Sequence, residues 1–520
     1  MGVARPEVFN AATWLVDRHL DAGRGDRVAL RSEDRCLTYA QLARSVATAG
    51  AGLAALGVQP EQRVLVAMVD GPEWVATFLG GLRIGAVPVP VSTMLLGAEL
   101  GALAADARAR VVVLSAAFAE AAGELCANAP EVADLIVAGP AEVAAPQGVR
   151  VHRFADTLGA EGEGPDPGVY PTWADSPAFW LYTSGTTGAA KAAMHRHADL
   201  RTTAETYAAQ VLSVGPDDVC FSVAKLFFAY GLGNSLTFPL ASGATTVLDP
   251  ARPTPAGVAA TVAAERPSLF FGVPTFYAAL LSSTISDDTF SSVRAAVSAG
   301  EPLPAELFHR FKERFGVEIL DGLGSTELLH IFLSNRRGAV LAGTSGSPVP
   351  GYEVRLVDDE GATVTEADQP GQLLVKGDSA ALGYWCRAEA TRRTFQGDWT
   401  RTGDVYAATT EGAYTYLGRA DDMIKAGGIW VSPAEVEGVL LAHPDIAEAA
   451  VVARPDQHGL EKPVAFCVGV PGRTLDTVAL DQFCRQQLAA FKRPREFRVL
   501  EELPRTATGK VQRYRLRALS

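Results

Sequence analysis

The sequence lacks the cysteine arrangements that would indicate a disulfide framework or a zinc site. No C-x-x-C pair occurs in the 520 residues, and no histidine stands close to a cysteine. Scattered thiols of this kind in a long chain favour a reducing compartment. We therefore expect six unpaired cysteines, at positions 36, 126, 220, 386, 467 and 484.

Basic residues are in deficit, since 46 lysines and arginines stand against 59 aspartates and glutamates, for a formal net charge of −13. This balance argues against a nucleic-acid-binding protein, which would need a basic surface. The deficit is uneven, because residues 485–520 hold 10 basic and 3 acidic residues. That basic end is either a solvated helix face or a lid that meets phosphates.

No apolar run is both long enough and free enough of polar residues to suit a membrane-spanning helix. The longest uncharged run, Leu226–Leu248, contains Asn234 and several hydroxyl residues, and the similar run Pro267–Ser286 carries two prolines. We predict buried strand and loop for both. The start of the sequence also lacks the apolar segment of a signal peptide. A cytoplasmic protein that contacts no membrane is expected.

Short apolar runs alternate with helical patterns through the first third. Strands are predicted at Arg63–Met68, Val111–Ser115 and Asp134–Ala138, and helices at Pro72–Leu82 and Ala116–Ala127. Strands that are apolar on both faces and separated by helices indicate a parallel sheet covered by helices. The first third is therefore predicted to be an α/β structure.

Capping patterns fix further helices. Thr38 with Gln41 forms a capping box before a helix over Tyr39–Leu56. Ser432 begins another helix, and strands at Ala449–Ala453 and Val464–Val470 follow it. A last helix is predicted near residues 475–491.

The length and this change of character predict two domains. The fold class is α/β, with a large N-terminal domain of helix-covered sheets over residues 1–420. A small mobile α+β domain takes residues 421–520.

The segment Tyr182–Lys191 (YTSGTTGAAK) carries the strongest chemical signal. It follows an apolar strand at Ala178–Leu181 and precedes a stretch compatible with a helix. Clustered hydroxyls, glycines and a lysine suit a loop that surrounds phosphate oxygens. It is not a Walker A loop, because Gly188 and Lys191 are not adjacent. The residues predicted to contact phosphate are Thr183, Ser184, Gly185, Thr186, Thr187, Gly188 and Lys191.

This segment resembles the phosphate-binding loop of the adenylate-forming superfamily, which includes acyl- and aryl-CoA synthetases, peptide-synthetase adenylation domains and firefly luciferases. Ala190 and Ala192 stand where that family commonly has proline and glycine. The resemblance runs from about residue 25 to residue 515. Further segments similar to the family's motifs follow in the family's order, at Asp321–Glu327, Trp399–Asp404, Tyr416–Lys425 and Pro504–Lys510.

The resemblance implies an enzyme that uses ATP to activate a carboxylic acid. Lys510 would bridge the carboxylate and the α-phosphate, and Glu327 would bind Mg²⁺. Thr183 and Lys191 are the other implied catalytic residues. Asp404 would bind the ribose hydroxyls with Arg419 beside it. The remaining implied nucleotide-binding residues are Gly300, Glu301, Pro302, Asp321, Gly322, Gly324, Ser325, Thr326 and Tyr416.

The segment Ala224–Asn234 is expected to line the pocket for the substrate acid. Its sequence resembles that of the benzoate-CoA ligase branch, as does the sequence of Gly324–Asn335. The first segment has no carboxylate to pair a substrate ammonium, which disfavours an α-amino acid. Aromatic walls suit a flat ring, although Phe227 is equally consistent with the core. The predicted pocket residues are Phe228, Ala229, Tyr230, Gly231, Ser298, Gly324, His330 and Ile331.

The resemblance implies a hinge at Asp421 and a passage for CoA lined by Lys425, Gly427, Gly428 and Trp430. The expected partners are an aromatic acid, ATP with Mg²⁺ and CoA, and a homodimer is also implied. Two other interpretations remain open. One is an aryl-acid adenylating enzyme that loads a carrier-protein thiol, and the other is a nucleotide-binding regulatory protein with a degenerate site.

Overall fold

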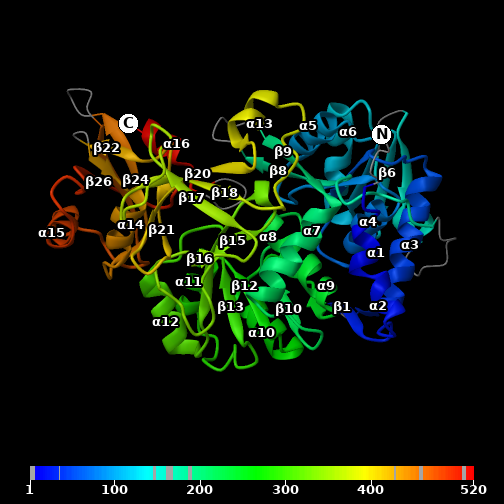
Figure 1. Ribbon diagram of the computed structural model, residues 1–520, viewed down its shortest axis with the longest axis horizontal. Coiled ribbons are helices and arrows are strands. Elements are labelled where there is room, and N and C mark those ends of the chain that lie inside the picture. Colours follow the sequence, from blue (N-terminus) through cyan, green and yellow to red (C-terminus); the bar gives the residue numbers. More distant parts are fainter. Residues whose placement is uncertain are drawn as a thin grey trace.

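A computed structural model gives the structure of the protein. It describes residues 6–33, 35–144, 148–159, 168–184, 190–426, 429–455, 461–505 and 511–519. Helices cover sheets through most of the chain, and a small α+β unit (orange and red) lies at the opposite end of the molecule from the first helices (Figure 1). The predicted fold class is confirmed.

The first sheet is parallel, with strand order β4-β3-β5-β6-β7. Alternate residues of β5 enter different cores, since Val111 and Val113 join one apolar cluster and Val112 and Leu114 another. Both faces are thus buried, as predicted. The strands are β3 (Arg63–Ala67), β4 (Val87–Pro90), β5 (Val111–Ser115), β6 (Asp134–Ala138) and β7 (Arg150–Arg153).

Helices cover this sheet on both sides. The capping box that opens α3 is confirmed, because Thr38 Oγ1 accepts from the Gln41 N–H and Gln41 Oε1 accepts from the Thr38 N–H. The helices of this part are α1 (Ala11–Leu15), α2 (Asp17–Asp21), α3 (Tyr39–Ala55), α4 (Pro72–Arg83), α5 (Gly97–Ala107) and α6 (Ala122–Asn128), with the short segments η1 (Ala116–Ala121) and η2 (Ala155–Gly159).

The second sheet has nine strands in the order β16-β15-β14-β13-β12-β10-β11-β1-β2, and the strands from β14 to β1 are parallel. Ligands bind outside the carboxyl ends of such strands. The strands are β1 (Val28–Ser32), β2 (Arg35–Thr38), β10 (Val219–Ser222), β11 (Thr245–Val247), β12 (Leu269–Gly272), β13 (Ala295–Ser298), β14 (Ile319–Gly324), β15 (Ile331–Ser334) and β16 (Ser347–Pro348).

The two segments predicted as buried strand and loop contain the strands β11 and β12, but each also contains a helical stretch that was not predicted. Helical residues run from Ala229 to Ser242 in the first segment and from Pro274 to Ser282 in the second. Their residues are apolar on all sides, so they lack the one-sided period that marks a surface helix. The helices of this part are α7 (His197–Thr203), η3 (Ala204–Ala208), α8 (Ala229–Leu232), η4 (Gly233–Thr237), α9 (Phe238–Ser242), α10 (Pro255–Glu265), α11 (Pro274–Ser282), α12 (Ala305–Phe315) and η5 (Thr326–Leu328).

The predicted phosphate segment belongs to a hairpin. Strands β8 (Pro177–Ser184) and β9 (Ala190–Arg196) pair antiparallel, so a strand follows the loop where a helix seemed compatible. The segment after Ala381 pairs with the outer edge of β9, which keeps residues 190–196 extended. Helix α7 begins only at His197.

An antiparallel sheet (yellow) connects these layers to the C-terminal unit (Figure 1). Strand β20 is central, with β18, β19 and β21 as neighbours. The elements are β17 (Glu353–Val357), β18 (Gly371–Lys376), α13 (Ala388–Thr394), β19 (Phe395–Gln396), β20 (Trp399–Ala408) and β21 (Tyr414–Arg419).

The C-terminal unit has its own apolar clusters, whose buried members all lie between Ile424 and Leu516. Ser432 caps its first helix as predicted, by accepting from the Glu435 N–H, whereas the helix predicted to end near residue 491 ends at Gln487. Its elements are β22 (Ile424–Ala426), β23 (Ile429–Val431), α14 (Pro433–Leu441), β24 (Ile446–Pro455), β25 (Glu461–Gly469), α15 (Thr477–Gln487), β26 (Glu496–Leu500) and α16 (Arg513–Ala518).

Two general expectations are met. All six cysteines are free. Among the described residues, no helix combines the length and apolar character needed to cross a bilayer.

Candidate active site

The hairpin brings two predicted catalytic residues together. Thr183 on β8 is the register partner of Lys191 on β9, so the two residues flank the base of the phosphate loop. The Lys191 ammonium lies 4.8 Å from the centroid of the Tyr384 ring. A cation held over an aromatic face keeps a defined position, and its charge is not paired with a carboxylate.

Glu327 lies in the short turn η5, directly after β14. Its Oε1 accepts a hydrogen bond of 2.6 Å from the Tyr384 hydroxyl. The turn is stabilised by a hydrogen bond within it, in which Ser325 Oγ accepts from the Leu328 N–H. Buried His195 approaches the Thr326 carbonyl oxygen with Nε2 at 2.8 Å and Asp199 with Nδ1 at 2.9 Å. The Glu327 carboxylate is therefore fixed in place and half-buried.

The carboxyl ends of β13 and β14 carry Ser298 and Asp321, which are register partners. Both side chains are buried. Burial raises the pKa of Asp321 well above its ordinary value, and the neighbouring Ser298 hydroxyl and Gly322 N–H oppose that rise. A buried carboxyl group at this edge of a parallel sheet is a candidate to bind a polar ligand.

Asp404 and Arg419 face each other on β20 and β21. Arg419 Nη1 donates to Asp404 Oδ1 at 2.9 Å, and Asp404 is 7% exposed. Tyr416 lies on the same strand as Arg419, with its ring 5.5 Å from that of Tyr406. Burial raises the pKa of Tyr406, and the nearby carboxylates of Asp404 and Asp321 raise it further. Asp404, the candidate to bind the ribose, and Asp321, the candidate for the adenine edge, thus both lie near the buried Tyr406.

The predicted acid pocket forms one aromatic cluster. The His330 ring lies 5.6 Å from Tyr230 and 4.5 Å from Phe238. The Tyr230 hydroxyl lies 3.0 Å from the Val297 carbonyl oxygen and 3.2 Å from that of Gly272. Its polar end is therefore engaged by the backbone, and its ring is the part that remains for a ligand.

His330 is neutral, because burial lowers its pKa to about 3. Nε2 faces two acceptors, Asn234 Oδ1 at 3.2 Å and the Tyr230 carbonyl oxygen at 3.3 Å, so this nitrogen carries the proton. Nδ1 is then an acceptor, and it has no partner among the described residues. A substrate carboxylate would find no free N–H donor on this ring as it is placed.

The glycines predicted for the pocket are required by the chain itself. A Cβ on Gly231 would lie 2.0 Å from the Lys225 carbonyl oxygen, and one on Gly324 would lie 2.6 Å from that of His330. Both glycines permit close approach of backbone segments. Gly300, by contrast, has φ +91° and open space where a Cβ would be.

Part of the predicted site lies outside the described residues. This holds for Gly185, Thr186, Thr187, Gly188, Gly427, Gly428 and Lys510, and for the side chains of Ser184, Lys425 and Trp430. Their roles remain predictions from the sequence. The remaining predicted positions (Phe228, Ala229, Ile331, Gly322, Glu301 and Pro302) lie in or beside the elements just described.

Sequence reasoning missed Tyr384 and Asp70. Tyr384 contacts Glu327 and Lys191 although it is far from both in the chain. Asp70 is buried and accepts from the Leu226 N–H, at the start of the pocket segment. The signal available for Asp70 was an aspartate that follows an apolar strand. Tyr384 had no such signal, because only the fold brings it to its partners.

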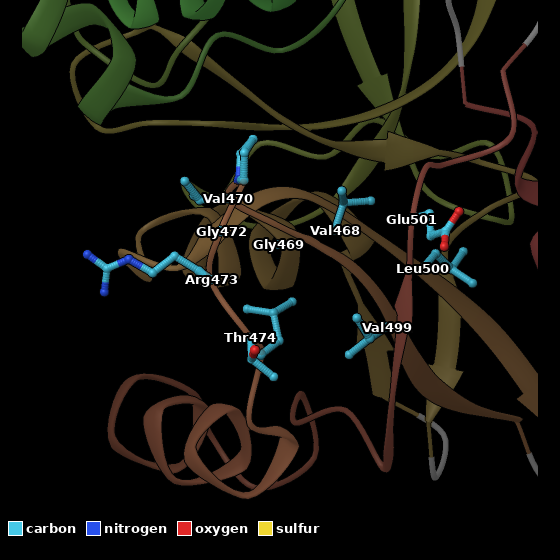
Figure 2. A pocket seen from close by; sticks show the side chains of 11 residues that line it. Val468, Gly469, Val470, Gly472, Arg473, Thr474, Val499, Leu500 and Glu501 are labelled. Carbon is cyan, nitrogen blue, oxygen red and sulfur yellow. The ribbon is translucent and has the colours of Figure 1, made fainter.

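A separate hollow of about 500 Å³ lies on the C-terminal unit, between the end of β25 and β26 (Figure 2). Val468, Leu475 and Val499 line it, and Arg473 extends away from its centre. It contains none of the predicted site residues. It is therefore separate from the candidate active site.

Comparison with known proteins agrees with this geometry. Residues 17–385 match the AMP-binding enzyme family, and residues 435–510 match the AMP-binding enzyme C-terminal domain. The chain therefore belongs to the AMP-binding enzyme family, the adenylate-forming superfamily, and within it to the benzoate-CoA ligase branch.

Relatives support the branch. A benzoate–CoA ligase of Thauera aromatica is 45% identical, with 99% of this chain and 96% of that protein covered. The structure of a benzoate CoA ligase from Burkholderia xenovorans LB400 matches with TM-score 0.89 and 41% identity, covering 98% and 100%. The anthranilate CoA ligase AuaEII, in complex with anthranoyl-AMP, matches with TM-score 0.91 and 38% identity, covering 99% and 98%.

Proposed function

We propose that this protein is an ATP-dependent aryl-acid–CoA ligase that acts on benzoate or a substituted benzoate. It forms an acyl-adenylate with release of pyrophosphate and then transfers the acyl group to CoA, with release of AMP. The observation that carries the proposal is that Lys191 and Glu327 meet at Tyr384 while Arg419, paired with Asp404, interacts electrostatically with Glu327, in a chain 45% identical to a benzoate–CoA ligase.

The nucleotide is held by residues of several elements. Thr183 and Lys191 at the base of the phosphate loop bind phosphate oxygens, and Asp404 binds the ribose hydroxyls while Arg419 orients its carboxylate. Asp321 stands at the adenine edge, beside the backbone of Gly300 to Pro302. Because the acid and the triphosphate are both anionic, cations on both sides of the α-phosphate lower the barrier to attack.

Mg²⁺ fits the chemistry of the donors at this place. Among the described residues, no group of three or more histidines, cysteines or carboxylates is placed to hold a metal ion. A single carboxylate, Glu327, suits Mg²⁺ that takes most of its ligands from water and phosphates. Bound there, the ion would neutralise phosphate charge.

The acid lies against the rings of Tyr230 and His330, which are 5.6 Å apart, with Phe228 of the same segment as a further pocket residue. No carboxylate stands in the segment 224–234, so the pocket favours an uncharged ring over an ammonium group.

The second half-reaction requires the C-terminal unit to turn about Asp421, which divides the chain into residues 1–420 and 421–520. Charge pairs support this boundary. Arg419 is tied to Asp404, whereas Asp422 pairs with Arg513 and Arg517 of the C-terminal unit. Between them, the Ala420 N–H donates to the Gly403 carbonyl oxygen of the large part, whereas the Asp421 carbonyl oxygen accepts from Arg517 of the C-terminal unit. Lys510 would serve adenylation, and Lys425 to Trp430 would line the path of CoA.

A carrier-protein acceptor is the second candidate, and it is less favoured because the more similar relatives are named CoA ligases. Pyrophosphate release and thioester formation from benzoate, with and without CoA, test the proposal. Benzoyl-CoA formation supports it. Adenylation followed by transfer only to a carrier protein would favour the alternative, and inactivity with all aryl acids would contradict both.

Two finer expectations belong to the same proposal. A homodimer is tested by the mass of the purified protein in solution. A cytoplasmic location suits the six free thiols and the supply of ATP and CoA.

A further inference from the structure

We propose that Tyr384 is a positioning residue that joins Glu327 and Lys191 into one rigid nucleotide-binding unit. The inference rests on the proposed function, because it takes Glu327 as the residue that faces Mg²⁺. It adds a residue and a role that the motifs do not contain.

Two contacts come from the one side chain. The Tyr384 hydroxyl donates to Glu327 Oε1 at 2.6 Å, and its ring face lies 4.8 Å from the Lys191 ammonium nitrogen. A tyrosine hydroxyl has one proton, so this bond fixes which carboxylate oxygen is engaged. The other oxygen, Oε2, has no hydrogen-bond partner in the described part of the chain. It is the oxygen left for a cation.

The backbone around Tyr384 is held to both partners. Ala381 N–H donates to the Glu327 carbonyl oxygen at 2.8 Å, so the segment binds Glu327 through main chain and side chain. On the other side, Leu382 N–H donates to the Met194 carbonyl oxygen and Trp385 N–H to that of Ala192. The segment thus forms an added edge on β9, the strand that carries Lys191.

The placement of Tyr384 is itself fixed by packing. It is 5% exposed, and its ring lies 5.5 Å from Phe395 in a small apolar cluster. The ring of the neighbouring Trp385 lies 4.7 Å from that of Trp180 of β8, at an interplanar angle of 32°.

A group that orients a metal-binding carboxylate typically changes metal affinity by roughly 10–100-fold when it is removed. The structure therefore assigns separable effects to the hydroxyl and to the ring. Loss of the hydroxyl should weaken only metal-dependent nucleotide binding. Loss of the ring should also weaken binding through Lys191, by about threefold or more.

The test measures binding of the non-hydrolysable analogue α,β-methylene-ATP by calorimetry, in Mg²⁺ and in EDTA. The variants are Tyr384→Phe, Tyr384→Leu, Glu327→Gln and the double variant Tyr384→Phe/Glu327→Gln. The control is Tyr39→Phe, which removes a buried hydroxyl that donates to the Ala244 carbonyl oxygen at 2.8 Å, far from the site. Melting curves set a temperature at which every variant is folded.

Tyr384→Phe should lose about tenfold in affinity with Mg²⁺ and nothing in EDTA, while the control matches the wild type in both. The double variant should match Glu327→Gln, because the hydroxyl acts through Glu327. Tyr384→Leu should lose affinity in EDTA as well. An unchanged Mg²⁺ effect in Tyr384→Phe, or equal losses with and without Mg²⁺, overturns the proposal.

Failure of the underlying assignment gives a different result. If Glu327→Gln keeps the full Mg²⁺ effect, Glu327 is not the metal ligand, and the inference about Tyr384 fails with it. If Glu327→Gln loses the effect and Tyr384→Phe keeps it, only the inference about Tyr384 fails.

Discussion

At the scale of single residues, buried Asp70 connects the two large sheets. It follows β3 of the first sheet and accepts from the Leu226 N–H at 3.1 Å, where the pocket segment begins. Burial raises its pKa to about 7, and nearby Lys225 opposes that rise only in part. Near neutral pH this carboxyl is thus close to its midpoint.

A pH-dependent stability follows from Asp70. Its folded pKa lies above the unfolded value, so the folded state holds more protons between about pH 4 and 7, and stability falls as pH rises through that window. Asp70→Asn keeps an acceptor for Leu226 and does not titrate. From pH 5 to 6 the wild type should lose stability relative to this variant by about 1.4 kcal/mol, and the loss per pH unit should fall to roughly half of that as the pH reaches 7. Urea unfolding at each pH measures this difference, and a difference that is constant with pH would contradict the prediction.

A second prediction at the residue scale is that Lys510 serves one of the two half-reactions and not the other. Lys510→Ala should lose adenylation of benzoate by about 100-fold or more and largely keep thioester formation from supplied benzoyl-AMP. The reason is that, in the proposed mechanism, the lysine would bridge the carboxylate and the α-phosphate only in the first step. Single-turnover assays of each half-reaction measure this, and equal losses in both would argue against a change of domain position between them.

At the scale of elements, the pocket segment depends on close backbone packing. Gly231→Ala would place a Cβ 2.0 Å from the Lys225 carbonyl oxygen, so the start of α8 must shift. We expect a loss of roughly 1–3 kcal/mol in stability together with weaker benzoate use. Gly438→Ala in α14 is the matched control, because nothing lies within 4 Å of its added Cβ, and it should be neutral or stabilising. Thermal unfolding of both variants measures these changes in stability. A Gly231→Ala variant as stable as the wild type would contradict the packing argument.

The hinge is also an element-scale prediction. Asp421→Pro should allow acyl-AMP formation and block thioester formation, because proline locks φ near −65° and prevents rotation at this residue. In the described part of the chain, the Asp421 N–H makes no hydrogen bond that proline would remove. Ala420→Pro, at the neighbouring residue, is measured in the same two half-reactions for comparison. An unchanged overall rate in Asp421→Pro would place the hinge elsewhere.

The sequence predicted elements well where a local signal exists. The β3, β5 and β6 runs are apolar on both faces and were predicted correctly as strands, and the Thr38 and Ser432 caps begin their helices as expected. The short helices within Leu226–Leu248 were missed because full burial removes the one-sided pattern.

The site shows the same division. Motif residues such as Asp404 and Arg419 meet as register partners, which their spacing around a hairpin allows. Tyr384 and Asp70 could not be found by spacing, because their partners lie on distant segments that only the fold brings together. The neutral state of His330 likewise depends on burial, which its sequence neighbours do not reveal.

At the scale of the whole molecule, the two parts divide the chemistry. In the proposed function the large part would hold the nucleotide and the acid, whereas the C-terminal unit has separate apolar clusters and carries Lys510 and the basic end. Separate apolar clusters are what a rotation of the small unit as one body would require. We propose that such a rotation presents different groups to the acyl-adenylate in turn.

The central claim is tested most directly by product stoichiometry. The purified protein is given benzoate, ATP, Mg²⁺ and CoA, and the products are quantified by mass spectrometry. The account predicts equal amounts of benzoyl-CoA, AMP and pyrophosphate, and benzoyl-AMP when CoA is left out. Formation of ADP and phosphate, or AMP formation that does not depend on the aryl acid, would contradict it.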